Sequence, residues 1–476
     1  MASNIVVPLL INGEEVTHSS TYDVKSPLTN TSCWAATSAS PDDALAAVSA
    51  AQAVFPSWSA TKPNVRIAIL LKAAAIMEAN MEEYAGYLTM EMGANVEAAY
   101  SFVLPLAIDM CRNIAGRILG ICGSVPVVQK EGQSAMVLRE PYGVCFGIVP
   151  WNAPYVFGIR SAATAIATGN TTVLKGSELT PRCYWAIGKA FAEAGLPAGV
   201  LNIISCRPED APQVVNAIIE HAAVRKINFT GSASTGRKIG RVCGENLKPC
   251  LMELGGKNAA IVCEDADLNK AAEECIAGAF LNAGQICMST DRILVHEAIL
   301  PGLLEAMKTQ LAASATSKDL PNVVSSASKD RLSALIADAL SHGAEIISGV
   351  DTQPDTPGTS FVPTILSKVS PSSTLHAQEA FGPLVAISTF ATEDQAVDMV
   401  NWTEYGLHAA VFTQDLRRGL RIAKRLQVGA CHINSMTVHD EPALPMGGVK
   451  SSGWGRFNGE EGLEDFLIRR VVTWDD

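Results

Sequence analysis

The sequence of 476 residues lacks several patterns that would place a protein in a functional class at once. Its twelve cysteines include no CxxC pair, so neither a zinc site nor a disulfide framework is indicated. Acidic residues outnumber basic ones by 48 to 36, and the formal net charge is -12. This balance argues against a nucleic acid or an anionic membrane surface as partner, because both require clustered Lys and Arg.

The sequence also has no uninterrupted apolar run of the roughly 18 residues that a membrane span needs. Residues 143–159 come nearest, but Pro150, Asn152 and Pro154 interrupt them. The first residues lack the basic region of a signal peptide, and scattered cysteines are typical of reduced, mostly buried thiols. We therefore expect a cytoplasmic protein with no metal site and no membrane partner.

Apolar residues, by contrast, are abundant. They make up 48% of the chain, against 18% charged residues, which is enough for a large core and excludes a disordered protein. A chain of this length exceeds one compact core, so we expect two or three domains.

Hydrophobic periodicity predicts a change of architecture along the chain. Short strands are expected around the Asn12-Gly13 turn, and helices follow at 41–55, 65–79, 82–91 and 96–118. Residues 123–142 change character: 134–140 alternate between apolar and polar residues, which predicts an exposed strand or hairpin.

From Gly143 onward, strands and helices alternate. We predict strands at 144–149, 171–175, 199–204 and 224–229, and helices at 162–168, 180–194, 211–220 and 234–243. This rhythm is typical of a parallel sheet covered on both faces. A second α/β region is expected from about 259 to 429.

Cys287 is the strongest catalytic candidate. It stands in Gly284-Gln285-Ile286-Cys287, directly after a segment, 271–282, that is predicted to be helical. A turn of this kind, with Gly284 allowing close backbone approach, would present the thiol to a substrate. The alternative is a small buried side chain, which is the commoner role of cysteine.

Glu253 and Asn152 could serve the same chemistry. Glu253 ends an apolar segment, where burial would raise its pKa toward that of a general base. Asn152 lies between two prolines after a strand, so its amide would be held rigidly and could stabilise an oxyanion. A surface carboxylate and an ordinary turn asparagine are the alternatives.

Two loops after predicted strands could contact a nucleotide. Residues 229–236 contain Gly231 and Ser232 at the start of a helix, where phosphates bind, although the loop is not GxGxxG. Glu178, close to Lys175 at another strand end, could accept hydrogen bonds from a ribose and repel a 2′-phosphate. Taken alone, these two side chains read as a solvated pair.

Together these motifs resemble the aldehyde dehydrogenase family over nearly the whole chain, from about Asn12 to Thr473. Seven motifs in order carry the resemblance: Pro150-Trp151-Asn152, Val173-Leu174-Lys175-Gly176-Ser177-Glu178, Phe229-Thr230-Gly231-Ser232, Glu253-Leu254-Gly255-Gly256-Lys257, Gly284-Gln285-Ile286-Cys287, Glu379-Ala380-Phe381-Gly382-Pro383 and Pro445-Met446-Gly447-Gly448-Val449-Lys450-Ser451-Ser452-Gly453.

The resemblance implies an α/β fold of three parts. They are a Rossmann-type NAD-binding domain (1–122 and 143–253), an α/β catalytic domain (254–450) and a small β extension for oligomerisation (123–142 and 461–476). A homodimer or homotetramer is expected from that extension.

The resemblance also implies roles for individual residues. Cys287 would attack the aldehyde, Asn152 would hold the oxyanion and Glu253 would activate the hydrolytic water. Hydride would pass to NAD, with NADP as the weaker cofactor. The residues expected to bind the cofactor are Trp151, Lys175, Glu178, Gly231, Ser232, Leu254, Glu379 and Phe381.

Within the family, three segments are most similar to salicylaldehyde, benzaldehyde and vanillin dehydrogenases, which implies an aromatic aldehyde. They are Pro150-Trp151-Asn152-Ala153-Pro154 with Gly158-Ile159-Arg160, Gly284-Gln285-Ile286-Cys287-Met288-Ser289-Thr290, and Thr437-Val438-His439-Asp440-Glu441. Expected pocket residues are Tyr155, Arg160, Ile286, Met288, Met446 and Trp454. Met446 and Trp454 depart from the usual Phe and Tyr, and Arg160 has a structural salt bridge as its alternative role. An aliphatic or semialdehyde substrate, a coenzyme A-dependent acylating enzyme and a non-catalytic protein are the competing functions.

Overall fold

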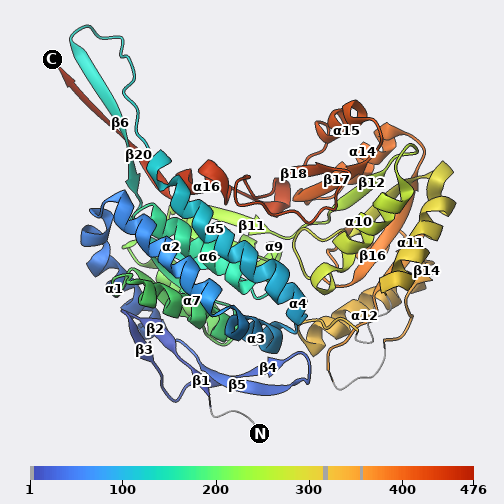
Figure 1. Cartoon of the computed structure of the whole chain (residues 1–476), viewed down its shortest axis with the longest axis horizontal. Helices are drawn as coiled ribbons and strands as arrows, with labels where there is room; N and C mark the ends of the chain where they lie inside the picture. Colours follow the sequence, from blue (N-terminus) through green and yellow to red (C-terminus); the bar gives the residue numbers. More distant parts are fainter. Residues whose placement is uncertain (1–4, 315–319, 354–357, 476) are drawn as a thin grey trace.

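The computed structural model describes residues 5–314, 320–353 and 358–475. Its described strands form two large sheets in two lobes, with a thin arm reaching out beyond the first lobe (Figure 1). A small additional sheet consists of β1 (Val6–Val7), β5 (Thr31–Thr37) and β4 (Thr21–Ser26).

The first lobe is built on an eight-stranded sheet. In spatial order its strands are β19 (Gly453–Trp454), β11 (Cys250–Leu254), β10 (Val224–Gly231), β7 (Val144–Ile148), β8 (Thr171–Lys175), β9 (Leu201–Ile204), β2 (Leu9–Ile11) and β3 (Glu14–Val16). The five central strands are parallel, and β19, β2 and β3 run antiparallel to their neighbours.

Helices cover both faces of this sheet, because its strands are apolar on both sides. One core layer packs beneath α2 (Pro63–Ala79), α3 (Met81–Met92), α5 (Leu104–Arg117), α6 (Pro154–Ala167) and α7 (Pro181–Ala194). The opposite layer lies beneath α1 (Pro41–Ser59), α8 (Ala211–Glu220) and α9 (Ala233–Glu245). Short segments α4 (Val96–Ala98), η1 (Ala99–Val103) and η2 (Ile118–Gly120) flank α5.

The second lobe has a seven-stranded sheet. Its order is β14 (Glu345–Ser348), β15 (Thr364–Ser367), β16 (Leu384–Phe390), β13 (Arg292–His296), β12 (Ala259–Val262), β17 (His408–Phe412) and β18 (Ala430–Ile433). The helices are α10 (Leu268–Phe280), α11 (Leu300–Ser314), α12 (Ser326–Ser341), α13 (Thr374–Ala377), α14 (Glu393–Asn401) and α15 (Leu416–Ala423). η4 (Glu297–Ile299) precedes α11.

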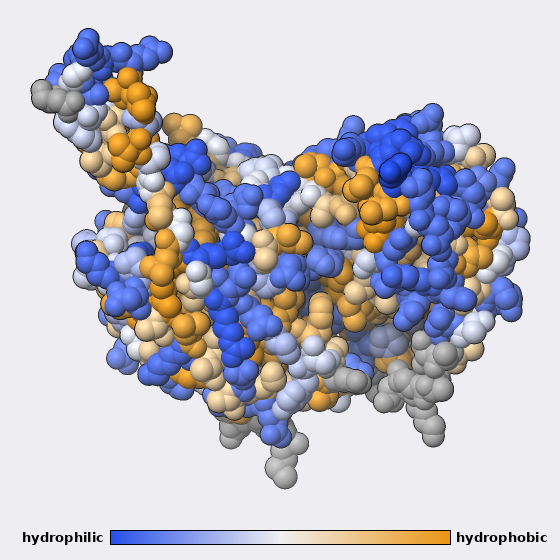
Figure 2. Space-filling model, turned by 45° about the horizontal axis from the view of Figure 1, so that its top comes forward, coloured by the Kyte–Doolittle hydropathy of each residue, from blue (hydrophilic) through white to orange (hydrophobic). Residues whose placement is uncertain are grey.

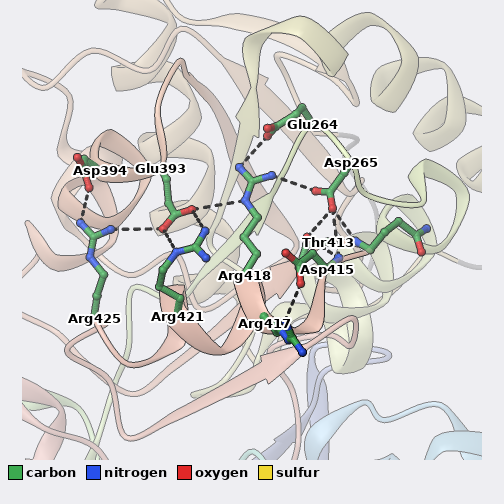
Figure 3. Close-up of polar contacts among 11 residues, drawn as sticks. Glu264, Asp265, Glu393, Asp394, Thr413, Asp415, Arg417, Arg418, Arg421 and Arg425 are labelled. Atoms are coloured by element: carbon green, nitrogen blue, oxygen red, sulfur yellow. Dashed lines mark hydrogen bonds and ion pairs between the residues drawn. The ribbon is translucent and has the colours of Figure 1, made fainter.

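Charged side chains fasten α15 to the end of this sheet. Arg418 contacts Glu264, Asp265 and Glu393, and Glu393 also pairs with Arg421 and Arg425 (Figure 3). Arg417 points away from this network in the same view. A network of this kind is stronger than isolated surface pairs, and it holds the helix that precedes the edge strand β18.

The arm pairs β6 (Gln133–Pro141) with β20 (Leu467–Asp475) in an antiparallel ribbon. Before β20 the chain returns to the first lobe through η5 (Lys450–Ser452), β19 and α16 (Gly459–Glu464). None of the described helices has the length and apolarity needed to cross a membrane.

Most predicted elements are confirmed, including the exposed strand within 123–142 and the alternation after Gly143. One helix was predicted too short: α6 begins at Pro154 rather than at residue 162. Proline fixes the first turn, and every residue of α6 is buried, so the first half shows no polar face from which to recognise a helix. The three domain ranges stay a prediction.

Candidate active site

Cys287 lies in an apolar cluster built by both lobes. The cluster joins Leu251 of β11 in the first lobe to Leu407, beside β17 of the second, and it includes Met288 and Met446. Cys287 itself is buried, with 7% of its surface exposed. The thiol therefore lies where the two sheets approach each other, shielded from bulk water.

The backbone turn before Cys287 is strained. α10 ends at Phe280, and Asn282, Ala283 and Gly284 then have φ values of 52°, 57° and 66°, which is the left-handed region that glycine tolerates best. A Cβ on Gly284 would lie 2.2 Å from the carbonyl oxygen of Gly382. The turn thus requires glycine there, and residues 281–282 do not continue the predicted helix.

Two buried amides fix the segment that carries the thiol. The Gln285 side chain donates to the Asn282 carbonyl at 3.2 Å and accepts from the Val324 N–H at 2.7 Å. Asn258 Nδ2 donates to the carbonyl of Cys287 at 2.8 Å. These bonds hold the Cys287 backbone in place, as a nucleophile that reacts in one geometry requires.

Asn152 lies beside this segment, in the loop between β7 and α6. Its Nδ2 donates to the Gln285 carbonyl at 3.0 Å, and its own carbonyl accepts from Asn282 Nδ2 at 3.2 Å. The side chain is 4% exposed. The Asn152 amide is thus bound to the backbone of Gln285, two residues before Cys287. From there it could donate to an oxygen that develops charge near the thiol.

Glu253 faces the Cys287 thiol from β11, where it pairs with Thr230 on one side and Gly453 on the other. The carboxyl is buried, and neither oxygen has a hydrogen-bond partner within ordinary distance among the described residues. Burial raises its pKa to about 7, against the lowering effects of Arg160, Cys287 and Thr230. A carboxyl with that pKa suits general base chemistry at neutral pH.

The same proximity affects the thiol. Burial first, and then the negative charge of the adjacent Glu253 carboxyl, raise the pKa of Cys287 well above its ordinary value. The nearby positive charge of Arg160 opposes this rise. At neutral pH the resting pair is therefore a thiol beside a carboxyl group that is partly ionised.

Arg160 forms the structural salt bridge that the sequence left as an alternative. Its Nη2 pairs with Asp440, and both side chains are buried. Asp440 also accepts from Asn458 Nδ2 at 2.8 Å. The guanidinium lies over the rings of Phe157 and Phe457, at 5.3 and 5.6 Å from their centroids. Arg160 thus places a fixed positive charge near Glu253 and Cys287.

The other expected pocket residues divide into two groups. Met288 and Met446 belong to the Cys287 cluster, and Ile286 packs against it. Tyr155 lies elsewhere: it stacks on Tyr84 with ring centroids 5.6 Å apart, and its hydroxyl donates to the Tyr84 carbonyl. Tyr155 therefore packs in the helical core layer of the first lobe and not in the Cys287 cluster.

Trp454 also lies outside the cluster. It is 51% exposed, and its Nε1 donates to the Cys250 carbonyl at 2.8 Å. A Cβ on Gly240 of α9 would contact its ring. Strand β19 pairs with β11 in a register that directs the Trp454 side chain over α9. Its neighbours are therefore Cys250 and α9, and not the residues of the Cys287 cluster.

A second carboxyl, that of the half-buried Glu379, lies near the first. Glu379 Oε1 accepts from the Gly256 N–H at 3.0 Å, and a Cβ on Gly255 would collide with this carboxyl group. Burial, with Asp291 and Glu253 adding to it, raises the pKa of Glu379 to about 8. Phe381 follows at φ 46° and packs edge-on against Trp151, with centroids 5.7 Å apart.

The remaining predicted cofactor residues line the ends of three strands. Lys175 ends β8 with a buried side chain, and the half-buried Glu178 accepts from the Ser177 hydroxyl at 3.3 Å. Gly231 ends β10, and Ser232 caps the N-terminus of α9. Leu254 ends β11 and packs against Gly236 of α9.

The sequence analysis assigned no role to several residues that organise the site. Asn258 follows the Gly-Gly-Lys motif directly and could have been noticed there. Thr437 donates its hydroxyl to the Met288 carbonyl at 2.6 Å, and Asp440 pairs with Arg160. Both lie in a long loop whose sequence gives no periodic signal.

Comparison with known proteins decides the family. The model of the aldehyde dehydrogenase family matches residues 15–472. The chain belongs to the aldehyde dehydrogenase family. This confirms the resemblance drawn from the seven motifs.

Similar proteins span the whole chain. Vanillin dehydrogenase of Pseudomonas fluorescens is 40% identical over 478 residues, covering 98% of this chain and 97% of that protein. A salicylaldehyde dehydrogenase from Pseudomonas putida G7, solved in complex with salicylaldehyde, has a TM-score of 0.95 at 33% identity and covers 99% of both chains. An NAD-dependent aldehyde dehydrogenase from Sinorhizobium meliloti has a TM-score of 0.95 at 31% identity and covers 100% of this chain and 95% of its own. The expected fold class is thereby confirmed.

The electrostatic coupling of Glu253 and Cys287 predicts the effect of Glu253→Gln on thiol reactivity. Removing the carboxylate removes a charge that raises the Cys287 pKa, so alkylation of Cys287 should rise at lower pH in the variant than in the wild type. The measurement is the pH dependence of iodoacetamide labelling, resolved by peptide mass spectrometry. Cys287→Ser is the control for peptide assignment. An unchanged or upward-shifted profile would show that the two groups are not coupled as described.

Proposed function

We propose that this aldehyde dehydrogenase oxidises an aromatic aldehyde of the vanillin, salicylaldehyde or benzaldehyde type to its carboxylic acid, with NAD as hydride acceptor. The observation that carries the proposal is the buried Cys287 thiol, faced by the Glu253 carboxyl and flanked by the Asn152 amide. These are the nucleophile, base and oxyanion donor of acyl chemistry.

In the first step Cys287 adds to the aldehyde carbon and forms a thiohemiacetal. The Asn152 amide and the Cys287 backbone N–H donate to the oxygen that becomes negative. Their positions are fixed before the substrate arrives, so little reorganisation accompanies the reaction. Arg160 adds a positive charge that favours ionisation of the thiol.

Glu253 acts in the second half of the reaction. After hydride loss Cys287 holds a thioester, and Glu253 takes a proton from the attacking water. Its pKa of about 7 keeps part of the population ionised at neutral pH. This buried base favours hydrolysis over acyl transfer to coenzyme A, since acylating relatives generally lack the base in this motif.

The residues present fit NAD, which when bound supplies the hydride acceptor. Ser232 and Ser234 expose hydroxyls at the N-terminus of the 13-residue helix α9, where the helix dipole and free N–H groups favour a pyrophosphate. Glu178, three residues after the end of β8, would bind ribose hydroxyls. Glu379, whose charge acts on Cys287, and Phe381, which packs against Trp151, would contact the cofactor near the thiol.

The aromatic substrate class is supported by the cluster around the thiol. Ile286, Met288 and Met446 give it an apolar, sulfur-rich wall, and sulfur–aromatic contacts favour a flat ring. The named activities of the relatives point the same way.

We also propose a cytoplasmic homo-oligomer. All twelve cysteines are free thiols, as in a reducing compartment. The β6–β20 arm carries exposed apolar side chains, visible as orange surface at the upper left of Figure 2. The exposed side chains of β20 include Val471 and Trp474, at 65% and 41% exposure. Such a surface on a thin ribbon is typical of subunit contacts.

Aromatic aldehydes should be better substrates than acetaldehyde. Two ring contacts of about 0.5–1.5 kcal/mol each would give roughly tenfold higher kcat/KM or more, if they persist in the transition state. The measurement is steady-state kinetics with benzaldehyde, salicylaldehyde, vanillin, acetaldehyde and a semialdehyde. Cys287→Ala is the control: it should lose turnover and still bind NAD. A higher kcat/KM for acetaldehyde or the semialdehyde would overturn the aromatic assignment.

NAD should be preferred over NADP. A 2′-phosphate beside the Glu178 carboxylate costs on the order of a few kcal/mol, reduced by the nearby Lys175 cation. The ratio of kcat/KM for the two cofactors measures this preference. Glu178→Gln, which keeps the shape and removes the charge, should narrow the ratio. Equal efficiency in the wild type would contradict the role of Glu178.

If the exposed apolar side chains of the arm form the subunit contact, charged replacements there should weaken the oligomer. Replacing Val471 and Trp474 together by Asp should lower the molecular mass in solution, because charged groups cannot be buried unpaired in an interface. Sedimentation velocity measures the mass, and circular dichroism checks that each subunit stays folded. A monomeric wild type, or an unchanged mass for the variant, would exclude the arm as the contact.

A further inference from the structure

A pair of cysteines outside the active site connects α9 to β11. Cys243 lies in the last turn of α9, and Cys250 is the first residue of β11. The chain reverses between them: the Lys248 N–H donates to the Cys243 carbonyl at 2.9 Å, and Leu247 has φ 52°. This tight turn brings the two side chains together.

Both side chains pack in the same apolar layer of the first lobe, and each thiol lies close enough to the other to shift its pKa. Their environments differ, since Cys243 is 1% exposed whereas Cys250 is only half-buried. The pair therefore has one accessible member and one that is shielded.

The charge distribution favours ionisation of the accessible thiol. The neighbouring Cys243 thiol, the nearby Lys226 cation and the Trp454 indole lower the pKa of Cys250, against the opposing effect of burial. The same contact raises the pKa of Cys243. An accessible thiolate beside a second thiol is the arrangement found in redox-sensitive cysteine pairs.

The active-site thiol has the opposite character. Cys287 is buried beside a carboxyl group that disfavours its thiolate. A small oxidant should therefore react at Cys250 in preference to Cys287 in the resting protein.

We propose that Cys250 and Cys243 form a reversible oxidation site for hydrogen peroxide. The Cys250 thiolate attacks the peroxide oxygen, the O–O bond breaks, and the departing hydroxide takes a proton to become water. Cys250 is then a sulfenic acid. Cys243 attacks its sulfur, the S–O bond breaks, a second water leaves, and a disulfide remains. Two thiols and one peroxide thus give one disulfide and two waters.

The site is connected to the strand that carries Glu253. Cys250 begins β11, and its carbonyl accepts the Trp454 indole N–H at 2.8 Å. Trp454 lies on β19, which pairs with Met252 and Glu253. A disulfide at the start of β11 would therefore constrain the strand three residues before the catalytic base. The oxidation site itself does not depend on the proposed function.

The experiment uses the full-length Cys287→Ala protein, so that oxidation at the active site cannot interfere. It is treated with hydrogen peroxide, remaining thiols are alkylated, and peptides are mapped by mass spectrometry with and without prior dithiothreitol. We expect a Cys243–Cys250 disulfide that dithiothreitol removes. Both thiols remaining alkylatable at peroxide levels that oxidise the exposed Cys122 would overturn the proposal.

Two single variants test the order of events. With Cys243→Ser, dimedone should label Cys250, because the sulfenic acid has no partner thiol. With Cys250→Ser, dimedone labelling of Cys243 should be absent. Labelling of Cys243 in the second variant, or none of Cys250 in the first, would overturn the assigned roles. Circular dichroism of each serine variant excludes misfolding as the cause.

Discussion

A carboxyl group removed from water beside a buried thiol is the constraint around which this structure is organised. Glu253 lies on a central segment of the first sheet, and Cys287 lies on a turn of the second lobe. Bringing an ionisable group into such a place costs free energy. That cost is reflected in a Glu253 pKa of about 7, which is the range that general base chemistry at neutral pH requires.

The two lobes make this environment jointly. The cluster around Cys287 draws Leu251 from one sheet and Leu407 from beside the other, so neither lobe alone would exclude water from the thiol. Arg160 and Asp440 join the lobes as well, because one belongs to α6 and the other to the loop after β18. The buried ion pair places a positive charge near the reacting groups and leaves the guanidinium packed between aromatic rings.

Precise positioning of the thiol depends on backbone strain that surrounding contacts hold in place. Three consecutive left-handed residues precede Cys287, and such a turn persists only where its neighbours determine it. Gln285 and Asn258 supply those contacts through buried hydrogen bonds. Side-chain contacts also hold the periphery of the second lobe in place. The arginine network of Figure 3 fixes α15, which precedes the edge strand β18.

The sequence by itself determined the alternation of strands and helices after Gly143, the candidate roles of Cys287, Glu253 and Asn152, and the family. These follow from local periodicity and from motifs in which the order of residues is the signal. Only the tertiary structure decided which side chains meet. Tyr155 and Trp454 stand next to motif residues in the chain, yet α6 and β19 direct them toward Tyr84 and Cys250. Asp440 and Asn258 reach the site from loops without periodicity, because long-range packing, rather than local pattern, places them there.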